Sequence, residues 1–579
     1  MLKDLKCSKV ILFGAGRGGI IWLNKLMRSG ITPAYFVDNN KAGATVRFDY
    51  NSIIHTFLIN TPESLLIENK AKLRIIITLE TPYYEELEAQ IEDMGLTECV
   101  FPSYVICCDW IATRLHLMFD HDILTFCCGS SNDFNDSRPE FPYFDNAEDT
   151  ILNYMQKRDE ILAELNNRTT IDISKPCLTC SRLKKINYID ISDKIEAINI
   201  SCYPAICQAK CVYCEVYTDP QNTHEKAKSS HYPKMIAEMI SYLEDTNLID
   251  DKCVFIVTPA EITIMPHMDL ILNAISAYRA AIATNGFLFE QKIADSLVKN
   301  GSQICVSIDS GSKETFRLVK GLDLFEKVTN NIIKYRSYGD VLLKYNIMAG
   351  VNDSEKDIDG FIDFLKSLGN QSMRLSFEYG LPLRTAFYPI VKFVERLREN
   401  GLTFSFHAYY EPSQIEGFIE QYYTDKHKDE FIELNAHLSK VFAEKYTDDY
   451  EGYRKYVWFA EICNMVSHFK DGTRFALLGP STNEPYVLAA FNKLSLPLQT
   501  TELSFIESYE ALRSNADIFI LRNKRAYNAV KDFISRGGND KRLIDIEKYF
   551  LSFEPAELFL RRRISKVYLK DSALVYDGE

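Results

Sequence analysis

The sequence lacks a hydrophobic run long enough to span a lipid bilayer. Its most apolar stretch, residues 100–119, is interrupted by Asp109, Arg114 and His116, whereas a membrane helix needs about 20 mainly apolar residues. The N-terminus also lacks the succession of basic, apolar and small residues that marks a signal peptide. We therefore expect a cytoplasmic protein with no membrane partner.

Positive charge is in the minority. The 579 residues include 66 Lys and Arg against 80 Asp and Glu, so the formal net charge is −14. An acidic surface repels phosphate backbones, which argues against nucleic acid as a general partner. Hydrophobic residues make up 46% of the chain, the balance of a folded protein, and the length predicts roughly three or four domains.

Cysteine, by contrast, is abundant and clustered. Ten of the 15 cysteines fall in one stretch: Cys107, Cys108, Cys127, Cys128, Cys177, Cys180, Cys202, Cys207, Cys211 and Cys214. In a reducing compartment, clustered thiols are more often metal ligands or catalytic groups than disulfides. We therefore look for metal chemistry in this part of the chain.

Strand and helix patterns alternate after residue 194. The strand-like runs are residues 197–201, 254–258, 281–284, 304–308, 342–347 and 373–377. Six strand-plus-helix units fit an α/β fold with an incomplete (β/α)6 barrel. The chemistry of such a barrel lies at the C-terminal ends of its strands.

Three cysteines follow the first of these strands. Cys207, Cys211 and Cys214 have the spacing C-x3-C-x2-C. Three thiolates on one loop can hold three irons of a cubane [4Fe–4S] cluster and leave the fourth iron open for a ligand. The competing interpretation is an accidental or zinc-binding group of cysteines.

This spacing, with the aromatic Tyr213 before the last cysteine, resembles the signature of the radical S-adenosylmethionine (radical SAM) superfamily. The resemblance covers about residues 194–385. It implies that S-adenosylmethionine chelates the open iron and that reduction then yields a 5′-deoxyadenosyl radical, which removes hydrogen from a substrate. It also implies an electron donor such as flavodoxin or ferredoxin.

The resemblance also implies residues that bind S-adenosylmethionine. Glu261 ends a Pro-Ala-Glu sequence where the family has a Gly-Gly-Glu-like turn, and it keeps the acceptor for the methionine amino group although the glycines are absent. Asn285 lies in a segment common near the cofactor, and Ser307 and Asp309 lie on the strand whose polar residues face the ribose.

A second cysteine group precedes the barrel. Cys128, a helical stretch, and the C-x2-C pair Cys177 and Cys180 resemble the auxiliary-cluster modules of SPASM or twitch type, which usually follow the barrel. Cys127 could take the place of Cys128, and with Cys202 or Cys107 as a fourth ligand the group could hold a second [4Fe–4S] cluster. The alternatives are a structural zinc ion and no metal at all.

The N-terminus contains a glycine-rich turn between a strand and a helix. Gly14, Gly16 and Gly19 form G-x-G-x-x-G, and Asp38 ends the next strand, as in a Rossmann-like nucleotide site. Residues 35–43 also resemble the N-terminal domain of bacterial sugar acyltransferases, which implies a nucleotide-sugar ligand. Alternatively, the glycines serve only close packing of strand and helix.

These observations define five regions and one preferred function. The regions are a Rossmann-like domain (1–105), the cysteine-rich module (106–190), the barrel (191–385), a mainly helical region (386–470) and a smaller C-terminal α/β domain (471–579). We expect a radical SAM enzyme acting on a nucleotide-sugar, another small molecule or glycan, or a peptide. The alternatives are an NAD(P)-dependent nucleotide-sugar oxidoreductase or epimerase with structural zinc, and a non-catalytic iron–sulfur protein.

Overall fold

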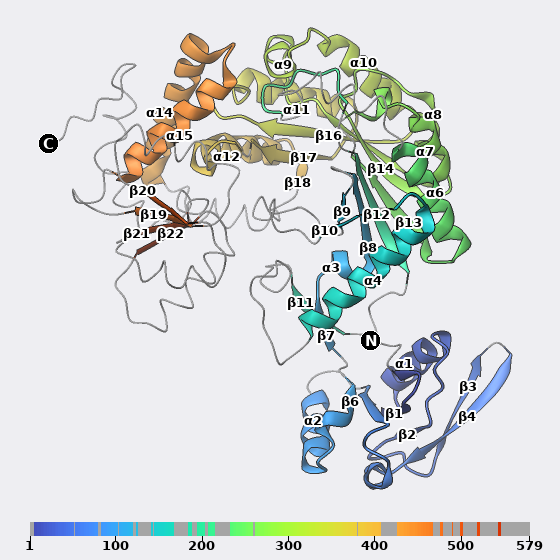
Figure 1. Cartoon of the computed structure of the whole chain (residues 1–579). Helices are drawn as coiled ribbons and strands as arrows, with labels where there is room; N and C mark the ends of the chain where they lie inside the picture. The colour runs from blue at the N-terminus through green and yellow to red at the C-terminus, as the bar shows by residue number, and fades with distance from the viewer. Residues whose placement is uncertain are drawn as a thin grey trace. The chain divides into compact units, whose positions relative to one another are not determined.

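The computed structural model describes most of the first 466 residues and four later strands (Figure 1). The described residues are 5–50, 52–78, 83–101, 104–119, 123–125, 140–142, 144–166, 183–187, 194–202, 206–214, 232–258, 261–378, 380–406, 425–466, 475–478, 489, 498–501, 518–521 and 542–545. The chain divides into two compact units, one formed by residues 1–113, 152–171 and 182–194, the other by the remainder. No described helix is long and apolar enough to cross a membrane.

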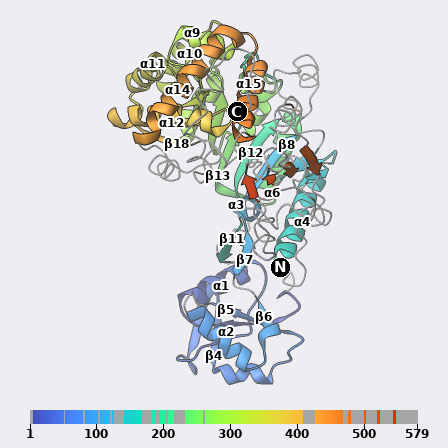
Figure 2. The same cartoon turned by 90° about the vertical axis from the view of Figure 1, so that its left-hand side faces the viewer.

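The first unit is built on a six-stranded sheet with the order β3-β4-β2-β1-β5-β6. Figure 2 shows strands β4, β5 and β6 of this unit together with its helices α1 and α2. Its strands are β1 (Lys9–Phe13), β2 (Tyr35–Val37), β3 (Thr45–Tyr50), β4 (Ile53–Asn60), β5 (Leu73–Ile77) and β6 (Val100–Phe101), all parallel to their neighbours except β3 against β4. Side chains of β1 alternate between two cores. Leu12 packs with helix α1 (Arg17–Arg28), and Phe13 packs with helix α2 (Tyr83–Asp93), so one helix covers each face.

A smaller part of the first unit is formed by segments that lie far apart in the sequence. Strands β7 (Tyr104–Cys107) and β11 (Lys184–Asn187) pair antiparallel. Leu162 of helix α4 (Ala147–Leu165) and Ala112 of helix α3 (Asp109–Thr113) pack with them in a small apolar core. Cys107 is buried in that core. The cysteine-rich region therefore contributes packing residues to this unit.

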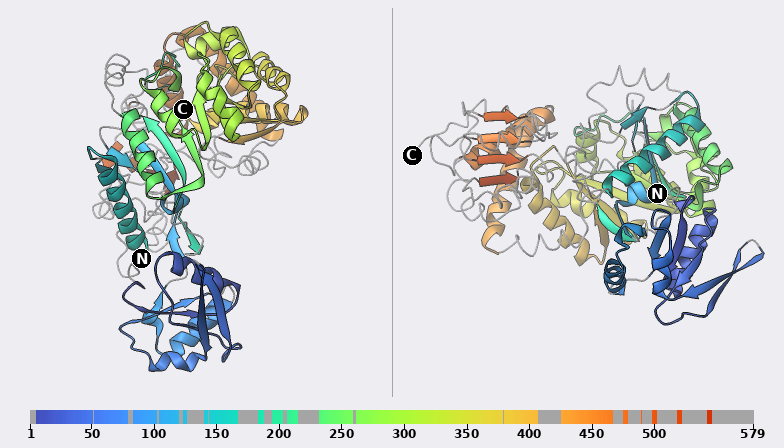
Figure 3. Two further views of the ribbon diagram at one scale, coloured as in Figure 1. Left: turned by 90° about the vertical axis from the view of Figure 1, so that its right-hand side faces the viewer. Right: turned by 60° about the horizontal axis from the view of Figure 1, so that its bottom comes forward.

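The second unit contains an eight-stranded sheet whose neighbouring strands are all parallel (Figures 1 and 3). Its strands, in spatial order, are β18 (Thr403–Phe406), β17 (Ser372–Phe377), β16 (Asp340–Ile347), β15 (Gln303–Ser307), β14 (Arg279–Thr284), β13 (Ile249–Val257), β12 (Ile195–Cys202) and β8 (Arg114–Phe119). Strands β12 to β17 are the six predicted ones, which confirms the α/β fold with a partial barrel. Strands β8 and β18, from outside residues 191–385, extend both edges.

Helices cover the outer face of this sheet (Figure 1). They are α6 (Tyr232–Asp245), α7 (Met268–Ala274), α8 (Gln291–Asn300), α9 (Lys313–Lys320), α10 (Phe325–Arg336), α11 (Glu355–Ser367) and α12 (Leu383–Glu399). Tyr345 of β16 packs edge-on against Phe361 and Phe393, with ring centroids 5.0 and 4.9 Å apart. Because strand side chains alternate, Lys344 and Asn346 lie on the opposite, inner face.

Two further helices close against the ends of β16 and β17. Helix α14 (Asp425–Val441) continues through a π-helical turn, Phe442–Tyr446, and helix α15 (Tyr450–Val466) follows. Leu438, Phe442 and Tyr453 share an apolar core with Met348 and Tyr213. The predicted helical region thus touches the segment that carries the cysteine triad.

The last described elements are four strands. They are β19 (Phe475–Leu478), β20 (Leu498–Thr501), β21 (Ile518–Leu521) and β22 (Arg542–Asp545), in a parallel sheet with the order β20-β19-β21-β22. β19 and β21 are short apolar runs, FALL and IFIL, as is typical of buried parallel strands.

Candidate cluster site at the end of the first barrel strand

The cysteine triad lies on a loop fastened to the end of helix α9. The backbone N–H groups of Lys210 and Val212 donate to the carbonyls of Lys320 and Val319, both at 3.0 Å. Gly321 makes this approach possible, because its φ is +70° and a Cβ there would lie 2.6 Å from the Cβ of Lys210. The loop is therefore held by backbone contacts independent of any ligand.

The three thiols lie close enough to influence one another electrostatically. Burial raises the pKa of Cys207, and it raises the pKa of Cys211 to about 11 although Lys320 opposes that shift. Cys207 and Cys211 are thus protonated at neutral pH, and iron binding would release their protons. Among the described residues no three Cys, His, Asp or Glu side chains converge as ligands of a single metal ion. Each thiolate of a cubane binds a different iron, so three neighbouring, non-converging thiols fit that group.

Asp309 and Lys320, both buried, bind the side chain of Tyr213 in the cysteine loop. The Tyr213 hydroxyl donates to Oδ2 of Asp309 at 2.6 Å, and Nζ of Lys320 pairs with the same oxygen at 2.5 Å. The other oxygen, Oδ1, accepts the backbone N–H of Asn346 at 2.7 Å. Burial alone lowers the pKa of Lys320, but the Asp309 carboxylate outweighs it and the pKa is raised. Lys320 therefore stays charged beside Cys211.

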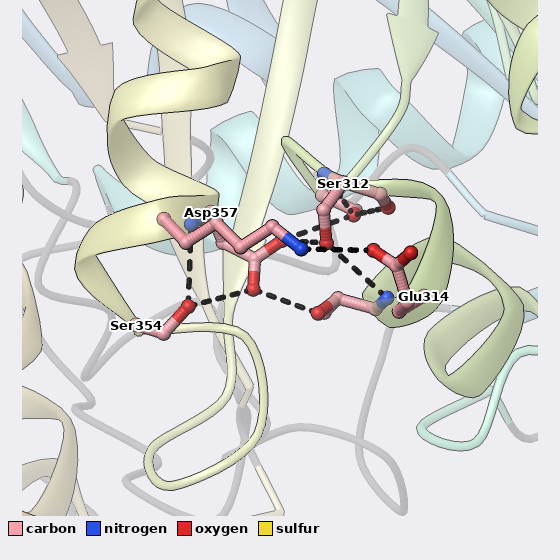
Figure 4. Close-up of polar contacts among 7 residues, drawn as sticks. Ser312, Glu314, Ser354 and Asp357 are labelled. Atoms are coloured by element: carbon pink, nitrogen blue, oxygen red, sulfur yellow. Dashed lines mark hydrogen bonds and ion pairs between the residues drawn. The ribbon is translucent and has the colours of Figure 1, made fainter.

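Two neighbouring loops fix the position of Asp309. It has a left-handed φ of 52° directly after β15, and the Asn352 side chain donates to its carbonyl at 2.9 Å. A second buried carboxylate, Asp357, accepts from Ser312 at 2.7 Å and from Ser354 at 2.9 Å (Figure 4). These serines cap helices α9 and α11, so Asp357 ties together the turns that hold Asp309.

A second chain of contacts reaches Cys207. The Asn285 side-chain Nδ2 donates to Sγ of Cys207 at 3.5 Å, and the Asn285 backbone N–H donates to Oε2 of Glu261 at 2.6 Å. Oε1 of Glu261 accepts from the hydroxyls of Thr263 at 2.6 Å and Thr284 at 2.7 Å. Glu261 is fully buried. It therefore orients Asn285 toward the thiol.

The structure thus assembles six of the predicted site residues into two groups. Cys207, Asn285 and Glu261 form one group; Cys211, Tyr213 and Asp309 form the other. Cys214 joins them through a backbone hydrogen bond to the Cys211 carbonyl at 3.0 Å. The carboxylates of Glu261 and Asp309 accept hydrogen bonds from the protein itself, a role that spacing in the sequence does not reveal.

The remaining predicted barrel residue, Ser307, begins a row across the inner face. Strand register aligns Ser307 of β15 with Lys344 of β16, Arg374 of β17 and Ser405 of β18. Burial lowers the pKa of Lys344. Within the described part of the chain, neither Lys344 nor Arg374 has an acidic side chain within ion-pair distance. The sequence analysis missed both, although a charged residue between Leu343 and Tyr345 in a buried strand was a usable signal.

In the glycine-rich turn of the first unit, the Asp38 carboxylate is bonded to backbone N–H groups of the same unit. Asp38 accepts the N–H of Ala15 through Oδ2 at 2.8 Å and that of Asn40 through Oδ1 at 2.9 Å. A Cβ on Gly19 would lie 2.3 Å from the Gly14 carbonyl oxygen, whereas one on Gly16 would meet nothing within 4 Å. Gly19 and Asp38 therefore serve the local packing of β1, α1 and β2.

The second cysteine group cannot be placed. Cys128, Cys177 and Cys180 lie outside the described residues. The auxiliary module they predict stays a prediction.

Comparison with known proteins now identifies the domain. Residues 203–365 match the model of the Radical SAM superfamily, so the chain contains a radical SAM domain. The predicted domain is confirmed, and the family implies a [4Fe–4S] cluster and S-adenosylmethionine as cofactors.

Individual relatives match only parts of the chain. A probable GTP 3′,8-cyclase of Archaeoglobus fulgidus is 35% identical over 102 residues, 17% of this chain and 33% of that protein. A GTP 3′,8-cyclase of Psychromonas ingrahamii is 29% identical over 184 residues, 30% of this chain and 49% of that protein. The chain therefore spans less than half the length of either relative. Among solved structures, Streptococcus suis SuiB bound to S-adenosylmethionine covers 46% of this chain and 57% of its own, with 14% identity and a TM-score of 0.30.

Proposed function

We propose that this protein is a radical SAM enzyme whose Cys207, Cys211 and Cys214 hold a [4Fe–4S] cluster. When bound, the cluster and S-adenosylmethionine supply a 5′-deoxyadenosyl radical that abstracts hydrogen from a substrate. The observation that carries the proposal is the triad itself, on a loop at the end of β12 within a radical SAM domain. A small electron-transfer protein of the flavodoxin or ferredoxin type supplies the electron.

The chain's own residues have defined tasks in this proposal. Asp309 and Lys320 fix Tyr213 and hence the peptide between Cys211 and Cys214. Asn285 donates to Cys207 and stabilises thiolate charge there. Lys320 provides positive charge beside Cys211, which offsets part of the negative charge of bound thiolates.

We also propose that the substrate carries an anionic group. Lys344 and Arg374 occupy adjacent positions on the inner face of the barrel sheet. Burial raises the pKa of Cys305 on the same face, and the positive charges of Arg374 and Lys344 both oppose that shift. The Asp309 carboxylate acts on Lys344 only from beyond ion-pair distance, and Arg374 has no ion pair with a described acidic residue. Two such cations side by side favour a phosphate or carboxylate ligand. A nucleotide-sugar satisfies this condition, and the matched relatives are named for GTP, another phosphorylated nucleotide.

A second metal site belongs to the proposal. Cys128, Cys177 and Cys180 would hold either an auxiliary [4Fe–4S] cluster or zinc. The iron and zinc content of anaerobically purified protein separates the two: about eight irons per chain means two cubanes, and about four irons with one zinc means a single cubane.

The test of the proposed function is the Cys211→Ala variant of the anaerobically reconstituted full chain. It should form no 5′-deoxyadenosine from S-adenosylmethionine and dithionite while keeping its circular dichroism. The control is Cys7→Ala, which removes an exposed thiol of the other unit and should leave the rate unchanged. Equal 5′-deoxyadenosine formation by Cys211→Ala and the wild-type chain would falsify the proposal.

A further inference from the structure

An arginine of helix α15 forms a hydrogen bond with the backbone of the cysteine loop. Nη2 of Arg454 donates to the carbonyl oxygen of Tyr213 at 3.1 Å and pairs with Oε1 of Glu378 at 2.5 Å. The side chains of Arg454 and Glu378 are only 14% and 4% exposed. Glu378 directly follows β17, so this contact joins the loop, the sheet and a helix outside residues 203–365.

The position of Arg454 is fixed from several sides. Its guanidinium lies 5.1 Å from the centre of the Tyr450 ring. A Cβ on Gly380 would lie 2.6 Å from Nε of Arg454, so no larger residue fits there unless the arginine moves. On the same helix, Tyr453 donates to the Ala349 carbonyl at 2.8 Å and Trp458 donates to the Gly380 carbonyl at 2.7 Å. Helix α15 is therefore anchored where Arg454 reaches the loop.

Tyr213 is consequently held at both ends. Its hydroxyl is bound by Asp309, and its carbonyl is bound by Arg454. The Tyr213 peptide lies between two cysteines of the triad, so its orientation sets how the Cys211 and Cys214 thiols face a common ligand.

We infer that Arg454 is a positioning residue for the cluster, acting through the Tyr213 carbonyl. This inference rests on the proposed function. It assigns to the helical region, which the family match does not include, a direct part in holding the cluster geometry. Partners that orient metal ligands typically change metal affinity or activity by about 10- to 100-fold when removed.

The experiment must separate this role from a merely structural one. Arg454→Met alone leaves the buried Glu378 carboxylate without its partner and destabilises the fold. The double variant Arg454→Met/Glu378→Gln removes both charges, so it should regain stability in urea while still lacking the donor to Tyr213. Arg454→Lys keeps a positive charge for Glu378 but replaces the rigid guanidinium, whose Nη2 contacts both the Tyr213 carbonyl and Glu378, with a shorter and more flexible ammonium group. The control is Lys455→Gln, an exposed neighbour paired with Glu451 at 3.5 Å.

The readouts are iron loss to a chelator, the electron paramagnetic resonance spectrum of the reduced cluster with and without S-adenosylmethionine, and the KM for S-adenosylmethionine. We expect the double variant and Arg454→Lys to lose iron about tenfold faster and to show an altered spectrum and a raised KM. Lys455→Gln should behave as wild type. Wild-type spectra and iron retention in a folded double variant, or in folded Arg454→Lys, would overturn the inference. Failure of the wild-type chain itself to bind iron would instead overturn the proposed function.

Discussion

The hydroxyl of Tyr213 and the carboxylate of Asp309 are joined by a 2.6 Å hydrogen bond across 96 residues of sequence. Burial and the neighbouring carboxylate raise the pKa of Tyr213, so the phenol keeps its proton and donates. The bond connects the cysteine loop after β12 with the end of β15.

Replacement of Asp309 by asparagine should destabilise the barrel strongly. Lys320, 1% exposed, would remain buried without its anionic partner, which typically costs about 3–5 kcal/mol. Urea unfolding followed by circular dichroism measures the change. The matched control is Asp323→Asn, whose partner Lys313 lies 3.5 Å away at the surface; its effect should stay within about 1 kcal/mol. Equal effects of the two substitutions would contradict the role assigned to Asp309.

Replacement of Asn285 by aspartate should make the reduction potential of the cluster more negative. The new side chain still accepts the backbone N–H of Phe287, at 2.9 Å in the wild type, but it no longer donates to Cys207 and it adds a negative charge. Both changes disfavour the more negative, reduced state. A redox titration followed by electron paramagnetic resonance measures the shift. Asn330→Asp makes the same charge change at an exposed position of helix α10, and an equal shift there would show that the hydrogen bond to Cys207 does not set the potential.

Two glycines of the N-terminal turn should differ in how strongly alanine destabilises the protein. A Cβ on Gly18 would lie 1.9 Å from the Thr78 carbonyl oxygen, so Gly18→Ala should destabilise the first unit by about 1–3 kcal/mol. Gly16→Ala meets nothing within 4 Å, so it should cost only the modest loss, under about 1 kcal/mol, of placing alanine at the N-cap of α1. Thermal unfolding of the full chain compares them. A tolerated Gly18→Ala would refute the packing role of this turn.

Removal of either inner-face cation should weaken binding of an anion. We expect Lys344→Gln and Arg374→Gln each to lower the affinity for GTP, used as a phosphate probe, by about tenfold or more in calorimetry. The exposed Arg279 of β14 provides the control variant, Arg279→Gln.

Because the pKa of Lys344 is lowered by burial, its charge is lost at a lower pH than that of an ordinary lysine. Binding should therefore weaken as pH rises, at a lower pH than for a site built on an ordinary lysine, and the Lys344→Gln variant should lack that dependence. Affinities that match the control would refute an anion site here.

Much of the fold was predictable because it depends on local pattern. Buried parallel strands are short apolar runs, and β12 to β17 all carry this signal. Strand β8 was missed because its sequence, RLHLMF, includes Arg114 and His116 and precedes β12 by more than 70 residues. Its place beside β12 depends on non-local pairing, in which His116 and Ser201 lie 3.0 Å apart.

The sequence by itself determined the cysteine triad and its chemical class, because ligands within one loop are brought together by spacing alone. Only the tertiary structure decided which groups the carboxylates of Glu261 and Asp309 bind. Glu261 and Asp309 accept donors from neighbouring turns, since a buried carboxylate must satisfy its oxygens wherever donors lie. The contact of Arg454 with Tyr213, 241 residues apart, likewise has no local signature, because helix packing alone brings the two together.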